Sequence, residues 1–147
     1  KIYEPIIRYA AGLGTPPKGV DPDRYQQFYA HCDVLIAGAG PAGLAAALVA
    51  GASGARVILA DEQPELGGSL LSETSATLDG HTPAEWLAEA RARLVKLPNV
   101  RVLTRCQVFG WYPDNLLGLV ERVTDHLAAP APICRANGSG RCARRKW

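Results

Sequence analysis

The stretch DVLIAGAGPAGLAAALVA, residues 33–50, decides the fold of this 147-residue chain. It begins with an apolar run that predicts a buried strand, and it ends with an alanine-rich run that predicts a helix slim enough to pack against a sheet. Gly38, Gly40 and Gly43 stand between the two runs with the spacing GxGxxG. A strand that turns on glycines into a helix is typical of folds that bind dinucleotides.

Each glycine has its own expected role. Gly38 permits the tight turn, Gly40 leaves no Cβ between the backbone and a pyrophosphate, and Gly43 lets the helix approach the sheet closely. The first N–H groups of the helix and its dipole favour an anion at this end, so we expect phosphates at the amides of residues 39–42. GxGxxG alone is a weak signal, because a turn that only needs glycine for packing has the same pattern.

An acidic residue at the end of the next strand strengthens the signal. Residues 56–60 predict that strand, and Asp61, 18 residues beyond Gly43, is placed to accept hydrogen bonds from a ribose diol. Glu62 is the fallback, since predicted strand ends are uncertain by a residue or two. A carboxylate here repels a 2′-phosphate, which argues against NADP and leaves both NAD and FAD.

The remaining elements complete an alternating α/β pattern. Thr82 and Glu85 form a capping box that begins a second helix, and residues 100–103 predict a third strand. Strand, helix, strand, helix, strand predicts parallel pairing with right-handed crossovers. Residues 106–123, CQVFGWYPDNLLGLVERV, predict a hairpin. We therefore expect a Rossmann-like dinucleotide-binding domain, a parallel sheet with flanking helices and the start of a β-meander, incomplete at its C-terminus.

The chain divides into three expected segments. Residues 1–31 are rich in Gly and Pro and predict an interdomain linker, in which Asp21 and Pro22 begin a short helix that runs through Tyr29. Residues 32–132 are the N-terminal part of the dinucleotide-binding domain, and residues 133–147 are predicted to be disordered. The chain starts at Lys1 and contains no methionine, so we interpret it as a fragment.

Composition excludes several other classes. No apolar run approaches the length of a membrane span, and no signal peptide is visible, so cytoplasmic is the default location. The basic tail lacks interleaved aromatics and gives no reason to expect nucleic-acid binding. The four cysteines and three histidines show neither metal-ligand spacing nor a triad, so we name no metal ligand and no catalytic residue. Trp86, Trp111 and Tyr112 are predicted to be core residues.

Three segments carry a family resemblance: DVLIAGAGPAGLAAA, VILADEQPELGGSLL and VFGWYPDNLLGLVERVTDHLA. They resemble the alpha subunits of heterotetrameric sarcosine oxidases, from about residue 2 to residue 132. The resemblance implies that NAD is held noncovalently on the glycine turn, with FAD as the alternative. It matches Asp61 to the ribose acid and Gly67–Gly68 to the glycine pair of the following loop. The candidate cofactor-binding residues are Gly38, Ala39, Gly40, Pro41, Ala42, Gly43, Asp61, Glu62, Gly67 and Gly68.

The resemblance also implies a function for the complete protein. It would be part of a multisubunit flavoenzyme, with beta, gamma and delta subunits, that oxidatively demethylates sarcosine to glycine and reduces oxygen to hydrogen peroxide. The flavins that accept electrons would lie on the beta subunit and at its contact with alpha, so this chain alone is expected to be inactive. Two alternatives stay open: a nonfunctional truncated product, and the nucleotide-binding half of a related FAD-dependent amine or opine dehydrogenase.

The tail, residues 133–147, differs abruptly from the rest of the chain. It carries two of the four cysteines and five basic residues without any helix or strand period. Back-translation from the third base of the Pro132 codon permits a peptide that resembles the next segment of the family. We therefore expect the tail to be translated out of frame.

Overall fold

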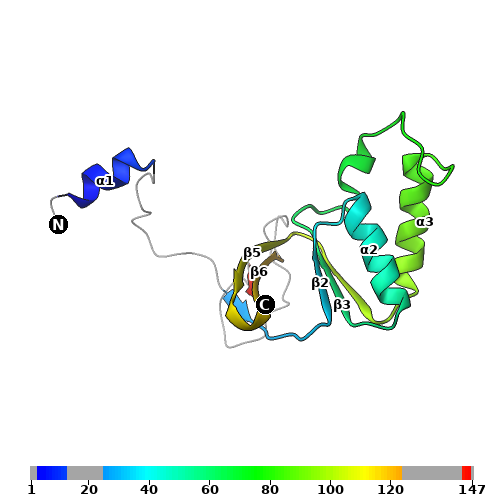
Figure 1. Ribbon diagram of the computed structural model, residues 1–147. Coiled ribbons are helices and arrows are strands. Elements are labelled where there is room, and N and C mark those ends of the chain that lie inside the picture. Colours follow the sequence, from blue (N-terminus) through cyan, green and yellow to red (C-terminus); the bar gives the residue numbers. More distant parts are fainter. Residues whose placement is uncertain (1–2, 13–24, 124–143, 147) are drawn as a thin grey trace.

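The computed structural model describes residues 3–12, 25–123 and 144–146 (Figure 1). Two short 3-10 helices, η1 and η2, accompany the α-helices and strands of these ranges. In chain order the elements are α1 (Glu4–Ala10), β1 (Tyr25–Gln27), β2 (Val34–Ala37), α2 (Pro41–Ala52), β3 (Val57–Ala60), η1 (Gly68–Leu71), α3 (Pro83–Val95), β4 (Val100–Leu103), β5 (Cys106–Tyr112), η2 (Pro113–Asn115), β6 (Leu116–Arg122) and β7 (Arg144–Lys146).

A parallel sheet in the order β2-β3-β4 forms the centre of the domain. Val34 pairs with Val57, and Val57 pairs in turn with Val100, so the three strands run in register. Helices α2 and α3 connect the strands and lie together on one side of this sheet, with the β5–β6 hairpin on the other (Figure 1). The predicted Rossmann-like α/β class and its parallel strands are confirmed.

The middle strand supplies the core of both layers, because it is buried along its whole length. Val57 and Leu59 pack with apolar side chains of α2 and α3, whereas Ile58 and Ala60 belong to a second cluster with β4 and the hairpin. Alternate residues of a strand point to opposite faces, so a strand covered on both faces is apolar throughout.

The predicted hairpin is confirmed as the antiparallel pair β5–β6, joined by η2. Asp114 and Asn115 have positive φ values of 61° and 55°, a conformation that short polar side chains tolerate. Trp111 is 77% exposed and Tyr112 is 47% exposed, so the prediction that they are core residues is wrong. One face of the hairpin covers the sheet, as the buried Cys106 and Leu119 show.

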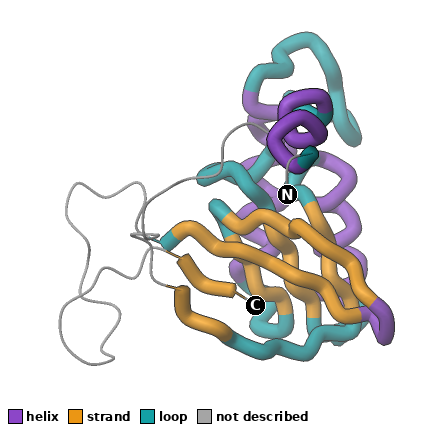
Figure 2. The backbone as a smooth tube through the Cα atoms, turned by 90° about the vertical axis from the view of Figure 1, so that its left-hand side faces the viewer, coloured by secondary structure: helices purple, strands orange, loops and turns teal. Residues whose placement is uncertain are grey.

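Strand β7 adds to the hairpin as the next antiparallel strand, and β1 pairs with β7 in parallel (Figure 2). Tyr25–Gln27 is therefore a strand, and the predicted helix through Tyr29 is wrong for these residues. The predicted disorder of 133–147 does not hold for Arg144–Lys146, and the rest of that tail lies outside the described residues. The three segment boundaries and the out-of-frame origin of the tail stay predictions.

The capping box at the start of α3 is confirmed. The Glu85 N–H donates to Thr82 Oγ1 at 3.3 Å, while Glu85 Oε2 accepts from the Thr82 N–H at 2.9 Å and from its hydroxyl at 2.8 Å. We expect Thr82→Ala to lower the free energy of unfolding by about 1 kcal/mol, because an orphan N–H of the helix loses its acceptor. Urea denaturation measures this, with the exposed Thr74→Ala as control.

The same box predicts a pH dependence. The hydrogen bonds from Thr82 lower the pKa of Glu85. A lowered pKa in the folded state stabilises the protein above the ordinary glutamate pKa, and this contribution is lost as pH falls through the lowered value. We therefore expect the stability difference between Thr82→Ala and the parent to shrink below about pH 4. A difference that stays constant down to pH 3 would contradict the role of the Glu85 carboxylate.

Candidate functional site

The glycine turn joins β2 to α2 and leaves the first amides of the helix open. Gly38 has a φ of 98° and its N–H donates to the Ala60 carbonyl at 2.7 Å, which ties the turn to β3. Gly40 is the N-cap of α2 and provides no side-chain cap, and the first turn carries no acidic residue. The N–H groups of Ala42 and Gly43 have no intrahelical acceptor by helix geometry. An anion at this end would satisfy them and complement the helix dipole.

Gly40 and Gly43 differ sharply in the space around them. A Cβ on Gly43 would lie 1.9 Å from the Gly38 carbonyl oxygen and 3.4 Å from Ile36 Cγ2. A Cβ on Gly40 would meet nothing within 4 Å. Gly43 therefore serves helix–sheet packing, whereas nothing in the described chain itself requires glycine at position 40 for space.

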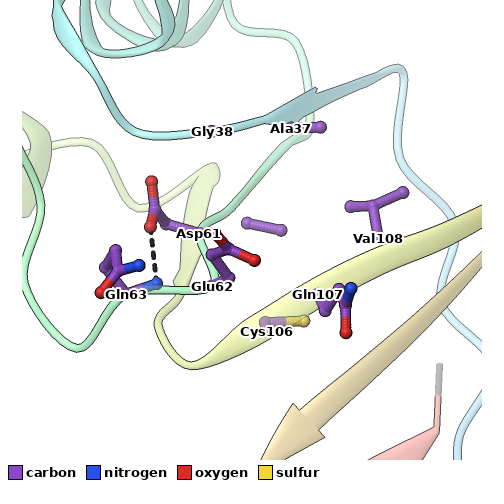
Figure 3. A pocket seen from close by; sticks show the side chains of 9 residues that line it. Ala37, Gly38, Asp61, Glu62, Gln63, Cys106, Gln107 and Val108 are labelled. Carbon is purple, nitrogen blue, oxygen red and sulfur yellow. Dashed lines mark hydrogen bonds between the residues drawn. The ribbon is translucent and has the colours of Figure 1, made fainter. Parts of the chain in front are cut away.

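Asp61 has a structural task that the sequence did not reveal. Its side chain lies at the end of β3, it is only 8% exposed, and Oδ2 accepts the Ala39 N–H at 2.5 Å. Oδ1 accepts the Gln63 N–H at 2.7 Å, as the dashed line in Figure 3 shows. The Ala39 amide, which we expected to meet phosphate, is thus engaged by this carboxylate. A carboxylate has about four acceptor positions, so Asp61 can still accept ribose hydroxyls.

The glycine pair of the next loop lies directly against the turn, and its two members differ. Gly67 is buried with a φ of 129°, its N–H donates to the Ala39 carbonyl at 2.8 Å, and a Cβ there would lie 2.7 Å from Leu87. Gly68 is exposed, and its Cβ position is 3.1 Å from the Gly40 Cα. Gly67 is therefore a packing residue, and Gly68 borders the same surface as Gly40.

A cavity of about 350 Å³ opens at the carboxyl ends of β2 and β3 (Figure 3). Two of its walls come from Asp61 and Glu62 after β3 and from Gln107 and Val108 of β5. The two β5 residues were missed by sequence analysis, because only the folded hairpin brings them to this edge. Open α/β sheets bind ligands at the carboxyl ends of their strands. The cavity is lined by Ala37, Gly38, Ala60, Asp61, Glu62, Gln63, Cys106, Gln107 and Val108.

The cavity wall carries a neutral thiol beside two acidic residues. Burial, and to a lesser extent the Glu121 charge, raises the pKa of Cys106 to about 12, so its thiol stays protonated at neutral pH. Glu62 is exposed at the cavity, next to the buried Asp61. A protonated thiol is a poor nucleophile, so the site is suited to binding rather than to thiol chemistry.

Residues 33–112 match the family model described as FAD dependent oxidoreductase. The chain belongs to this family. The match spans both the glycine turn and the cavity walls, and it supports a flavin dinucleotide as the cofactor class. FAD, held as the alternative in the sequence analysis, gains support from the match, whereas NAD as the first choice gains none.

Curated relatives of this chain confirm the predicted resemblance. Sarcosine oxidase subunit alpha of Rhizobium meliloti (strain 1021) is 55% identical over 131 residues, which cover 89% of this chain and 13% of the relative. The subunit of the same name from Corynebacterium sp. (strain U-96) is 40% identical over 137 residues, covering 93% and 14%. The chain thus spans about one-seventh of the length of these relatives.

The solved structures agree on the fold. L-proline dehydrogenase from P.horikoshii superimposes with a TM-score of 0.56 at 22% identity, covering 71% of this chain and 21% of that one. At this identity the likeness shows the fold alone. Within the described ranges, no helix combines the length and apolar character needed to cross a bilayer. The same ranges contain no group of three His, Cys, Asp or Glu side chains that could hold a metal ion.

Proposed function

We propose that this chain binds the ADP half of a dinucleotide. The pyrophosphate lies at the amides of Ala42 and Gly43, beside the open Gly40, and the adenosine occupies the cavity that ends at Asp61. The observation that supports the proposal is that the glycine turn and the cavity adjoin each other. Gly38 of the turn lines the cavity, and Asp61, which also lines it, accepts the Ala39 N–H of the turn. The amides supply donors to phosphate, and the acid supplies acceptors to ribose.

The nucleotide proposed is FAD, as the family match supports. NAD has the same ADP half and would use the same groups, so it stays as the alternative. The groups proposed to bind the ADP half are the glycine turn, the Asp61 carboxylate and the cavity beside them. Titration of the purified chain with ADP, FAD and NAD distinguishes the two: tighter binding of FAD than of NAD would support FAD, and the reverse would support NAD. The absence of binding by all three nucleotides would contradict the proposal.

For the complete protein, we propose the alpha subunit of a cytoplasmic sarcosine-oxidising complex with beta, gamma and delta subunits. Two curated relatives named sarcosine oxidase subunit alpha support this. The reaction proposed is oxidative demethylation of sarcosine to glycine with reduction of oxygen to hydrogen peroxide. Since the Cys106 thiol is protonated and the turn and cavity fit a dinucleotide, the role proposed for this chain is to hold the cofactor. Peroxide formation from sarcosine by the purified complex tests the assignment.

Asp61 is proposed to set the preference against a 2′-phosphate. We expect the parent chain to bind NAD better than NADP, and Asp61→Asn to reduce this ratio by the equivalent of about 1–3 kcal/mol, through lost repulsion and lost hydrogen bonds. Asn cannot accept from both the Ala39 and Gln63 amides through two oxygens, so affinity for both nucleotides will also fall. The ratio cancels that common loss.

The neighbouring acid provides the control for the same experiment. Glu62→Gln removes a charge at the cavity without touching the bonds of the turn, and we expect it to leave the NAD to NADP ratio nearly unchanged. A larger change in Glu62→Gln than in Asp61→Asn would transfer the ribose role to Glu62. Equal affinities of NAD and NADP in the parent would contradict both assignments.

A further inference from the structure

The loop from Asp61 to Gly67 is held at its two ends by different means. At its beginning, the Cys106 N–H donates to the Asp61 carbonyl at 2.7 Å, and the Arg105 N–H donates to the Gln63 carbonyl at 3.0 Å. These backbone bonds fix the first half of the loop to the start of β5. Towards its end the loop meets helix α3 instead.

One guanidinium group on α3 binds the second half of the loop. Arg91 Nη2 donates to the Leu66 carbonyl oxygen and, at 2.9 Å, to Glu65 Oε1. The Arg91 side chain is 35% exposed, against 60% for Glu65. An exposed ion pair contributes little by itself, but a charged donor to a half-buried carbonyl is a stronger hydrogen bond. The bond to Leu66 is therefore the one that can fix the loop.

Leu66 immediately precedes the glycine pair that touches the phosphate turn. The Gly67 N–H donates to the Ala39 carbonyl at 2.8 Å, and the Cβ position of Gly68 is 3.1 Å from the Gly40 Cα. The two backbone segments are closely packed at this contact, because a methyl group on Gly68 would lie closer to Gly40 than an ordinary van der Waals distance. A shift of the Leu66 carbonyl would therefore move Gly67 and Gly68, and with them the turn at Ala39 and Gly40.

We propose that Arg91 is a positioning residue for dinucleotide binding. It acts through Leu66 and the glycine pair and holds the loop at the distance that keeps the Ala39–Gly40 turn in its binding shape. This inference rests on the proposed function, since it assigns Arg91 to the same site. The chemical class it serves is the ADP half that FAD and NAD share.

The test compares Arg91→Ala with the parent chain, using ADP, FAD and NAD as probes in titration calorimetry. We expect all three to bind about tenfold more weakly, the scale of one charge-assisted hydrogen bond. We also expect faster hydrogen exchange at the Gly67 amide in the absence of nucleotide. Arg91→Lys keeps the positive charge but lacks the planar guanidinium group, and it should restore part of the affinity.

Arg93→Ala is the matched control, because Arg93 lies on the same helix and its ion pair among the described residues, at 3.8 Å, is with Glu89 of that helix. It should change neither affinity nor Gly67 exchange. If Arg91→Ala does not fold, Arg91→Met, which keeps an unbranched side chain without a donor, takes its place, and parent affinity in that variant would overturn the inference. Parent-like binding in Arg91→Ala, or an equal loss in Arg93→Ala, would also overturn it. A parent chain that binds none of the probes would instead refute the proposed function, and the inference with it.

Discussion

Gly43→Ala is expected to prevent folding of the domain or to lower its free energy of unfolding by at least about 3 kcal/mol. The added Cβ would lie 1.9 Å from the Gly38 carbonyl oxygen, which is backbone and cannot turn aside as a flexible side chain could. Relief requires α2 to move away from β2. That movement would open the core in which Leu44 and Ala47 are fully buried. Urea denaturation followed by circular dichroism measures the loss.

The matched control is an alanine at another position of the same helix. Ala46 is exposed on α2, and Ala46→Gly should cost about 1 kcal/mol through helix propensity alone. The loss of unfolding free energy at position 43 should be several times larger. Its cause also differs, since a clashing methyl group is added at position 43, whereas a methyl group is removed at position 46. Similar stability losses for the two variants would mean that the close contact between α2 and β2 is not required.

The local features of this fold were predictable because neighbouring residues determine them. The capping box needs only Thr82 and Glu85, three positions apart, and a short apolar run predicts β2 and β3 without knowledge of their partners. The role of Gly43 followed from the motif as well, and the 1.9 Å approach gives its physical reason. Such signals lie within one turn or one strand.

What the sequence did not reveal depends on residues far apart in the chain. Asp61 was expected to face the ribose, but its bond to the Ala39 N–H joins residues separated by 22 positions. Gly67 and Gly68 have the same side chain, and only the packing of Leu87 against Gly67 separates their roles. Tyr25–Gln27 forms a strand because it pairs with Arg144–Lys146, a partner that no local pattern indicates.

Gly40→Ala is expected to abolish dinucleotide binding while leaving the fold nearly unchanged. A Cβ at position 40 meets nothing within 4 Å, and the backbone there has φ −71° and ψ −174°, values that alanine adopts without strain. The protein itself therefore tolerates the methyl group, which would fill the space reserved for the pyrophosphate beside the open amides of α2. We expect the affinity for ADP, FAD and NAD to fall by at least about 100-fold, or roughly 3 kcal/mol, with the free energy of unfolding within about 0.5 kcal/mol of the parent. Calorimetric titration and urea denaturation of the same preparation measure both quantities.

Gly54→Ala provides a comparison outside the site. Its Cβ also meets nothing within 4 Å, but its φ of 87° is strained for alanine, so this variant should lose stability. Undiminished nucleotide binding by a folded Gly40→Ala chain would show that the pyrophosphate does not approach this turn.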